Sequence, residues 1–178
     1  MKDSTLKQLS LVGTSKLSAA VAQLLDQSAA ISFEDLTISG NQIICWLPKV
    51  ADPVDEQVQD LVDMIDQAHN QPEKIVVWSP AGTADDAQPD QLQQWWGPEW
   101  RNIIAAYLYM VKMIDELEYP YTVVRSLPVT AAGPAGKLVA EGKSMTGQTV
   151  SLESVADAVV AACRGKYTNE SIGVDADI

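Results

Sequence analysis

Short apolar runs alternate along the chain with segments in which apolar residues recur at helical spacing. Four runs are predicted as strands at 8–12, 42–47, 74–79 and 121–125, and the apolar runs at 42–47 and 74–79 are predicted to be buried strands. Weaker strand patterns occur within 31–38, at 137–140 and at 171–174. Because helical patterns separate these strands, the sequence predicts an α/β fold with a doubly wound parallel sheet covered by helices on both faces.

Two of the predicted helices have informative boundaries or faces. Asp52 is expected to be the N-cap and Pro53 the first residue of a helix whose apolar stripe runs from Val54 to Ala68. A longer helix over 98–118 has apolar residues around most of its circumference, which indicates burial on more than one side. With 178 residues, 47% of them hydrophobic, the chain is expected to form a single domain over 1–178.

The charge of the chain excludes some classes of partner. It has 24 acidic and 12 basic residues and a net charge of −12, so we expect neither nucleic acid nor an anionic membrane as a partner. The stretch 50–100 holds 11 of the acidic residues and one basic residue. Within it, Asp85, Asp86 and Asp90 follow a predicted strand, and we expect them to border the cleft and to disfavour polyanionic ligands.

Other residues indicate the compartment and the absence of a metal site. The N-terminus lacks the apolar run of a signal peptide, and no apolar run is long enough to span a membrane. Cys45 and Cys163 lie in apolar segments and are expected to be small buried residues rather than a disulfide. The sequence therefore predicts a cytoplasmic protein. His69 is the only histidine and is expected at a helix end, so no metal site is predicted.

The segment 13–18 links the first predicted strand to the first predicted helix. It has the spacing of G-x-G-x-x-G, with Ser15 and Ser18 at the second and third glycine positions. Gly13 permits a tight turn, and the helix N-terminus together with Lys16 favours an anion. Taken alone, the motif fits a turn that binds nothing equally well.

Ligands of doubly wound sheets bind outside the carboxyl ends of the strands, where the strand order reverses. The loops after the strands ending near 12, 47, 79 and 125 are therefore expected to form the site. The candidate cofactor-binding residues are Gly13, Thr14, Ser15, Lys16, Leu17, Leu47, Pro48 and Ser79.

Three segments resemble one protein family. Residues 74–82 (KIVVWSPAG) resemble its fourth strand and Ser-rich end, and 118–126 (EYPYTVVRS) resemble its "(L)DYTIVRP" strand, with Ser126 in place of the usual proline. Residues 150–159 (VSLESVADAV) resemble its "ISREDVADAL" helix. On these motifs the chain resembles the NAD(P)H-binding, NmrA-like branch of the atypical short-chain dehydrogenase/reductases. The resemblance implies a Rossmann-like three-layer fold that binds NAD or NADP and a small-molecule ligand.

The chain departs from this family where the adenosine ribose is bound. The family usually has a full second strand, a ribose-reading residue and a helix, where this chain has only the 16 residues of 26–41. No Arg or Lys occurs in 17–48, so a reader of the 2′-phosphate is missing from that stretch. Glu34 or Asp35 is the candidate for binding ribose hydroxyls, which favours NAD over NADP, and both residues equally fit a surface position.

A second departure concerns catalysis. The dehydrogenases that the chain resembles use Tyr-x-x-x-Lys, in which the lysine lowers the pKa of the tyrosine so that it can donate a proton. Here Tyr107 and Tyr109 precede Lys112 by five and three residues, so the dyad is broken. A count back from Tyr121 places Tyr107 at the lysine position. Ordinary carbonyl reduction is therefore not predicted, and no catalytic residue is assigned.

The long helix bears on assembly. In the resembling dehydrogenases it often forms a dimer interface, which implies a homodimer through 100–117. The alternative is that the segment around Trp95 and Trp96 covers its second face.

Two functions remain open on the sequence. The first is an NAD(P)-binding protein with a weak or specialised oxidoreductase or redox-sensing role. The second is a degenerate Rossmann protein that no longer binds a dinucleotide and acts as a non-enzymatic interaction or regulatory dimer.

Overall fold

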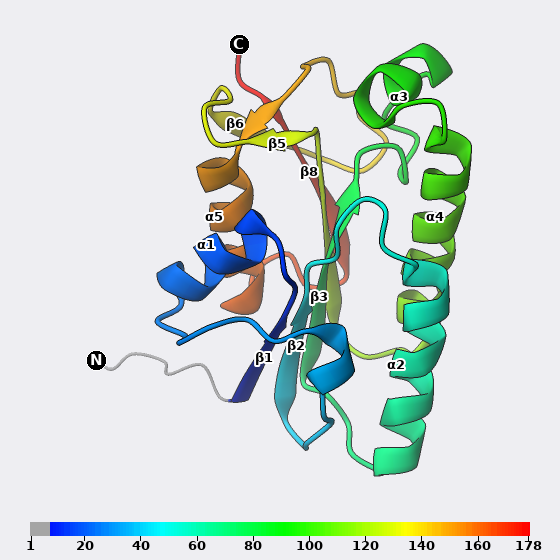
Figure 1. The fold of residues 1–178 in the computed structure, drawn as a ribbon, viewed down its shortest axis with the longest axis vertical. Helices are drawn as coiled ribbons and strands as arrows, with labels where there is room; N and C mark the ends of the chain where they lie inside the picture. Colours follow the sequence, from blue (N-terminus) through cyan, green and yellow to red (C-terminus); the bar gives the residue numbers. More distant parts are fainter. Residues whose placement is uncertain (1–7) are drawn as a thin grey trace.

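The central sheet follows the chain order except at one edge (Figure 1). In the computed structural model, which describes residues 8–178, the sheet has the order β1-β2-β3-β4-β8-β6. Its strands are β1 (Gln8–Val12), β2 (Gln42–Trp46), β3 (Lys74–Pro80), β4 (Tyr121–Ser126), β8 (Glu170–Ala176) and β6 (Gly136–Val139). All neighbours are parallel except β6, which pairs antiparallel with β8. The predicted parallel α/β sheet is confirmed, with one antiparallel edge.

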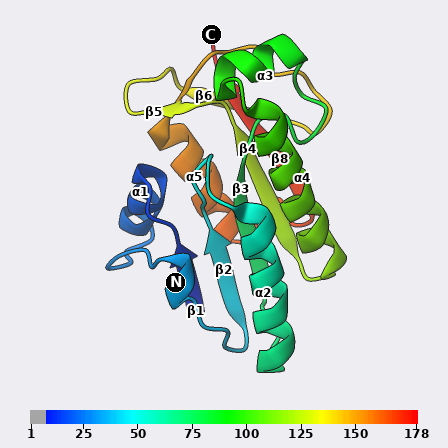
Figure 2. The same cartoon turned by 45° about the vertical axis from the view of Figure 1, so that its right-hand side comes forward.

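Helices cover both faces of this sheet, as predicted. Helices α1 (Lys16–Leu24) and α5 (Leu152–Cys163) lie on one face, and α2 (Val54–Ala68) and α4 (Trp100–Glu116) lie on the other (Figure 2). The short helix α3 (Pro89–Trp96) lies beyond the carboxyl ends of the strands. A separate pair of short strands, β5 (Val129–Thr130) and β7 (Val150–Ser151), lies near that same end.

The buried surface follows the predicted patterns. Every residue of β2 and β3 is buried, because helices cover both faces of these central strands. In α2, Val54, Val58, Leu61 and Ile65 are buried, whereas its five carboxylates are exposed. The acidic stretch is therefore largely a solvated helix face. No helix within 8–178 is long and apolar enough to cross a membrane.

The predicted start of α2 is wrong by one residue. Pro53 is the N-cap and the helix begins at Val54, so Asp52 does not cap it. Instead, Oδ2 of Asp52 accepts a hydrogen bond of 2.9 Å from the backbone N–H of Lys49. At the other end, His69 is the C-cap in a left-handed conformation, in agreement with its expected place at a helix end.

The predicted strand within 31–38 is also wrong. Ile31 makes a single parallel bridge to Val12, after which the chain turns into a 3₁₀ helix, η1 (Phe33–Asp35). The backbone N–H of Gly13 donates to the carbonyl of Ile31 at 2.8 Å. The ring of Phe33 packs against Trp46 with the ring centroids 5.3 Å apart. This aromatic contact and the short length of the segment explain why the pairing stops after one residue.

The position of Ile31 defines where the strand order reverses. Ile31 lies on the outer side of β1, and β2 lies on its inner side. The chain therefore crosses over β1 between these two pairings. The carboxyl ends of β1 and β2 form the switch point, which is where doubly wound sheets bind their ligands.

Candidate functional site

Gly13 makes the turn after β1 possible through close packing. A Cβ atom at this position would lie 2.7 Å from the carbonyl oxygen of Leu47 and 2.9 Å from Cβ of Ser18. Both distances are shorter than real Cβ atoms show, so only glycine fits without a shift of the backbone. Ser18 is buried against this turn, and its small side chain allows α1 to lie close to β1.

The first turn of α1 offers hydrogen-bond donors. Ser15 is the N-cap, and its hydroxyl accepts from the backbone N–H of Ser18 at 3.2 Å, while Oγ of Ser18 accepts from the N–H of Ser15 at 3.0 Å. This capping box turns the Ser15 side chain toward the helix. The N–H groups of Lys16 and Leu17 have no acceptor among residues 8–178. They lie at the positive end of the helix dipole, where an anion is stabilised.

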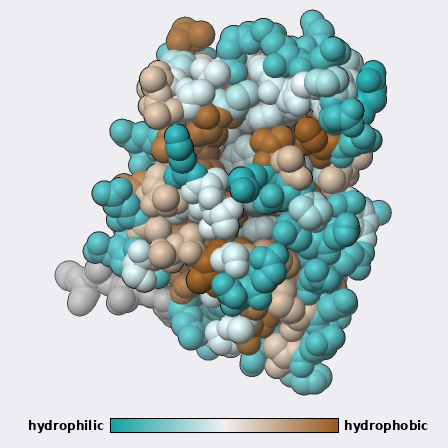
Figure 3. Space-filling view, in the orientation of Figure 1, coloured by the Kyte–Doolittle hydropathy of each residue, from teal (hydrophilic) through white to brown (hydrophobic). Residues whose placement is uncertain are grey.

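A cavity of about 350 Å³ opens beside this helix end. It brings together the start of α1, the loop after β2, the end of β3, α3 and the loop after β4. Its lining residues are Ser15, Lys16, Leu17, Pro48, Lys49, Val50, Trp78, Trp96, Pro128, Val129, Thr130, Ala131 and Leu152. We call it the main cavity. Its lining is mostly apolar. In Figure 3, patches of hydrophobic surface lie among hydrophilic residues in the upper half of the molecule.

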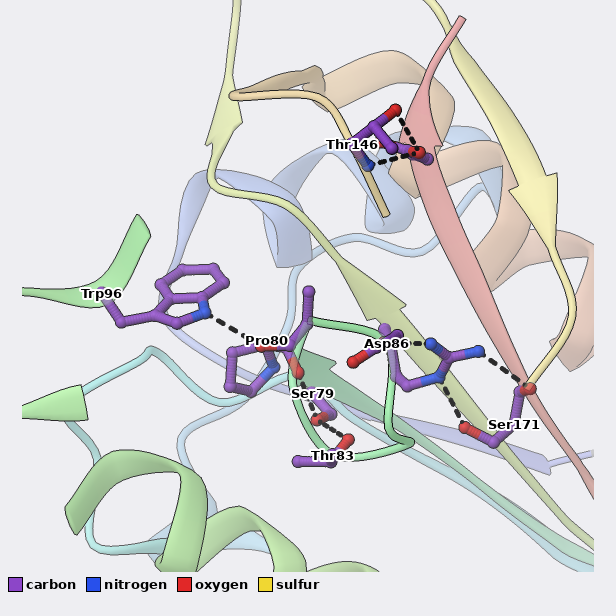
Figure 4. A network of polar contacts seen from close by, with 10 residues as sticks. Ser79, Pro80, Thr83, Asp86, Trp96, Thr146 and Ser171 are labelled. Carbon is purple, nitrogen blue, oxygen red and sulfur yellow. Dashed lines mark hydrogen bonds and ion pairs between the residues drawn. The ribbon is translucent and has the colours of Figure 1, made fainter. Parts of the chain in front are cut away.

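Two tryptophans shape the wall of the main cavity. Nε1 of Trp78 donates to Oγ of Ser126 at 2.9 Å. Nε1 of Trp96 donates to the carbonyl of Ala81 at 2.9 Å (Figure 4). The two rings pack edge to face with centroids 6.4 Å apart. Each indole is held by a hydrogen bond, and the two rings give this wall a flat aromatic surface.

A second cavity, of about 150 Å³, lies on the other side of the loop after β2. We call it the small cavity. Its lining residues are Val12, Gly13, Thr14, Ser32, Phe33, Glu34, Trp46, Pro48, Lys49, Asp52 and Gln57. It shares Pro48 and Lys49 with the main cavity, so these residues lie between the two. Oε1 of Gln57 is buried without a hydrogen-bond partner, which leaves an acceptor for a ligand hydroxyl or amino group.

The charges around the main cavity differ from those predicted. Among residues 8–178, no carboxylate lines it, and the expectation that Asp85, Asp86 and Asp90 border the cleft is wrong. Asp86 is buried and forms an ion pair with Arg125, because the loop after β3 folds inward over β4 (Figure 4). Asp85 and Asp90 are exposed to solvent elsewhere. The charged residues of the main cavity are therefore Lys16 and Lys49.

The other candidate residues occupy different places. Thr14 and Pro48 line the small cavity, whereas Leu47 is fully buried and presents its carbonyl oxygen to Gly13. Ser79 is fully buried, and its hydroxyl lies 2.9 Å from that of Thr83 (Figure 4). Of the candidates, Ser79 and Leu47 line neither cavity.

No tyrosine of the described part of the chain, 8–178, lines the main cavity. Tyr107 is fully buried and donates its hydroxyl proton to the carbonyl of Lys49 at 2.6 Å. Burial and, secondarily, the charge of Asp52 raise the pKa of Tyr107 far above its usual value. Lys112 is exposed and lies 3.9 Å from Glu116. Tyr107 and Lys112 therefore do not form a tyrosine–lysine pair, as their spacing in the sequence predicts.

Comparison with known proteins bears on this arrangement. A family model described as NAD(P)H-binding matches residues 6–165. No curated protein sequence matches the chain.

Solved structures share the fold at low sequence identity. A short-chain dehydrogenase/reductase from Veillonella parvula in complex with NADP is 14% identical with a TM-score of 0.70, over 96% of this chain and 95% of the other. A protein described as a candidate NADH-flavin reductase from Streptococcus pneumoniae is 14% identical with a TM-score of 0.71, over 96% and 99%. An oxidoreductase from Lactococcus lactis is 10% identical with a TM-score of 0.63, over 96% and 91%.

Proposed function

This chain belongs to the NAD(P)H-binding family whose model matches residues 6–165, and on that premise we propose that it is an NmrA-like, atypical short-chain dehydrogenase/reductase that binds a nicotinamide dinucleotide and reduces a small molecule with it. The observation that carries the proposal is the pair of free N–H groups on Lys16 and Leu17. They lie at the switch point, beside a glycine turn, and their residues line the main cavity.

The residues around the switch point fit such a cofactor. The diphosphate would bind the first turn of α1, where a Cβ atom at Gly13 would collide with the backbone. The adenosine ribose would occupy the small cavity, where Glu34 and the unpaired Oε1 of Gln57 accept hydrogen bonds from hydroxyl groups. The nicotinamide would lie in the main cavity against the indoles of Trp78 and Trp96.

NAD is the form of cofactor that the small cavity favours. Glu34 lines this cavity, whereas Asp35 does not line it and accepts a hydrogen bond of 3.0 Å from the hydroxyl of Ser32. Of the two candidates that the sequence leaves open, Glu34 is therefore the ribose ligand that we propose. A carboxylate accepts hydrogen bonds from ribose hydroxyls and repels a 2′-phosphate.

The bound nicotinamide would supply a hydride, and the protein would supply orientation and shelter from water. Trp78, Trp96 and Leu152 line the main cavity with apolar surface, which would shield the reacting atoms from water once a dinucleotide is bound. The hydroxyl and ammonium donors on its lining belong to Ser15, Lys16, Lys49 and Thr130. Because no tyrosine is among them, we propose a substrate whose reduction needs no proton from a tyrosine–lysine pair.

We also propose that the protein is a homodimer in the cytoplasm. Leu108 and Tyr109 on the outer side of α4 are 47% and 37% exposed, and helix α3 leaves them uncovered. Dimerisation through α4 would bury them. The two buried free thiols, Cys45 and Cys163, suit a reducing compartment.

Titration calorimetry with NADH and NADPH tests the cofactor proposal. We expect micromolar binding of NADH and weaker binding of NADPH. The variant Glu34→Gln should lose most of this preference, because a neutral amide no longer repels a 2′-phosphate. Asp35→Asn is the matched control, one residue away and outside the small cavity, and it should bind both cofactors as the wild type does.

Three outcomes would contradict the proposal in different ways. Absence of binding at millimolar NADH would contradict a role in dinucleotide binding and favour a degenerate protein that acts through another partner. An equal loss of the preference for NADH over NADPH in Glu34→Gln and Asp35→Asn would contradict the assignment of Glu34 as the ribose ligand. Tight binding without turnover of any hydride acceptor would favour a redox sensor.

A further inference from the structure

We propose that Lys49 is a second cationic contact for the diphosphate of the dinucleotide and that Tyr107 is its positioning residue. This inference rests on the proposed function and deepens it, because it assigns a phosphate-binding residue outside the glycine turn. It also gives Tyr107 a role that does not involve proton transfer.

The position of Lys49 supports this assignment. Lys49 and Pro48 are the residues that line both cavities, so Lys49 lies where a ligand that spans the two would have its centre. Lys16 lines the main cavity from the start of α1, after the neighbouring parallel strand β1. A dinucleotide has a flat ring system at each end and an anionic diphosphate at its centre. The main cavity and the small cavity would each take one end, and the lysine side chains would contact the diphosphate.

Lys49 has no ion-pair partner among the residues that the structure describes. Within residues 8–178, neither Lys49 nor Lys16 forms an ion pair, although the protein has twice as many acidic as basic residues. Asp52 is close to Lys49 in sequence, but its carboxylate accepts from the backbone N–H of Lys49. The side-chain ammonium group is therefore free to meet an anionic ligand.

The backbone of Lys49 is held from two sides. Its N–H donates to Oδ2 of Asp52 at 2.9 Å, and its carbonyl accepts from the hydroxyl of Tyr107 at 2.6 Å. Tyr107 is itself fixed, since it is fully buried in α4 and packs edge to face on Trp78 with centroids 5.9 Å apart. The loop after β2 is thus fastened to α4, and the lysine side chain starts from a fixed point.

Tyr107 also connects this arrangement with the missing dyad. By count from Tyr121 it stands where the dehydrogenases that the chain resembles have their catalytic lysine. Its hydroxyl faces the backbone of Lys49 and not the main cavity. The cation at this site comes instead from Lys49, on the loop after β2, and the tyrosine orients that loop.

The first experiment measures NADH and adenosine binding by calorimetry for Lys49→Met, Lys49→Arg and a control. We expect Lys49→Met to bind NADH about tenfold more weakly, the loss of one charge-assisted contact, and Lys49→Arg to bind within about threefold of the wild type. Adenosine has no phosphate and should bind all variants equally. Lys112→Met is the control, because this lysine is exposed on α4 and lines neither cavity.

Salt dependence provides a second readout. The Debye length falls from about 10 Å at 0.1 M to about 3 Å at 1 M ionic strength. The difference in NADH affinity between wild type and Lys49→Met should therefore shrink at high salt. A difference that is independent of salt would indicate lost packing and would overturn the proposed phosphate contact.

A double-mutant cycle tests the role of Tyr107. Tyr107→Phe removes only the hydroxyl that holds the carbonyl of Lys49, and we expect NADH binding several-fold weaker than in the wild type. In the Lys49→Met background the same change should have little further effect on NADH affinity, because the cation it orients is already gone. A purely structural role would give additive losses and would overturn the positioning role.

The outcomes separate this inference from the proposed function. If the wild type binds no NADH, the proposed function fails. If the wild type binds NADH and Lys49→Met binds it equally well, the proposed function stands and the inference is overturned. If Lys49→Met changes only the KM of the hydride acceptor, the lysine contacts the acceptor and not the diphosphate, and the inference is again overturned.

Discussion

At the scale of single residues, the charge of the main cavity depends on the buried ion pair of Asp86 with Arg125. Gly13 and Lys16 are recognisable because the motif around them has a fixed spacing. The pairing of Asp86 with Arg125 is not, since 39 residues separate them and a carboxylate in a loop ordinarily faces water. This buried pair removes a negative charge from the cleft, so a prediction based on the count of acidic residues gave the wrong charge for the main cavity.

Tyr107 carries a prediction about pH. The raised pKa of its buried hydroxyl means that above pH 10, its usual value, the folded protein keeps a proton that the unfolded chain loses. The unfolded state then binds fewer protons, so stability falls as pH rises, by about 1.4 kcal/mol per pH unit for one group. Below pH 10 the contribution of this group to stability is constant.

The measurement is urea unfolding of wild type and Tyr107→Phe from pH 8 to pH 11. The difference between the two proteins in free energy of unfolding should be constant up to about pH 10 and should then narrow or reverse, since phenylalanine does not ionise. Other groups that titrate in this range, such as Lys74, are present in both proteins and cancel in the difference. If the free energies of unfolding of the two proteins changed in parallel from pH 8 to pH 11, the hydroxyl of Tyr107 would not be held protonated by burial.

At the scale of elements, the pattern of apolar residues is sufficient to predict the central strands and the long helices. It does not predict the short helix α3. The strands β2 and β3 are continuous apolar runs and were predicted from the sequence. Helix α3 was not, because only Leu92 and Trp95 of its eight residues are buried and no stripe is visible. Its capping box, formed by Gln88 and Gln91, and its first residue, Pro89, are the signals that mark it.

The N-cap of α1 gives a prediction that separates stability from binding. Ser15→Ala removes the hydroxyl that accepts from Ser18 and should destabilise the protein by about 1 kcal/mol, whereas Ser15→Gly should cost only a few tenths. For NADH affinity we expect Ser15→Gly to bind more tightly than Ser15→Ala and than the wild type, because glycine at the second motif position lets the diphosphate approach the backbone.

Thermal unfolding and calorimetry on the same three proteins would check both parts. Equal affinities for wild type and Ser15→Gly would show that the serine side chain does not limit access to the helix end. A Ser15→Gly variant less stable than Ser15→Ala would contradict the capping role of the hydroxyl.

At the scale of the whole molecule, the fold was predictable and the edge of the sheet was not. Alternating strands and helices are sufficient to predict a doubly wound sheet. Whether Ile31 starts a strand depends on contacts far along the chain, such as that of Phe33 with Trp46, which no local pattern contains. The antiparallel pairing of β6 with β8 is likewise a matter of tertiary contact.

The oligomeric state is a property of the whole molecule, and we expect a homodimer. Size-exclusion chromatography with light scattering should give a dimer for the wild type and a monomer for Leu108→Asp, which places a charge on the exposed outer face of α4. Leu138→Asp is the matched control, because Leu138 is 50% exposed on β6, far from α4. A monomeric wild type would contradict the proposed dimer, and dissociation by both variants would contradict the choice of face.

The single bridge at Ile31 bears on how long a dinucleotide would stay bound. Where the dehydrogenases that the chain resembles usually have a full second strand and a helix, this chain has one bridged residue, the short η1 and a cavity of about 150 Å³. Differences in affinity between related complexes lie mostly in the dissociation rate, so we expect a short residence time. A protein that releases its oxidised cofactor in each turnover uses NADH as a co-substrate and can respond at once to a change in its supply.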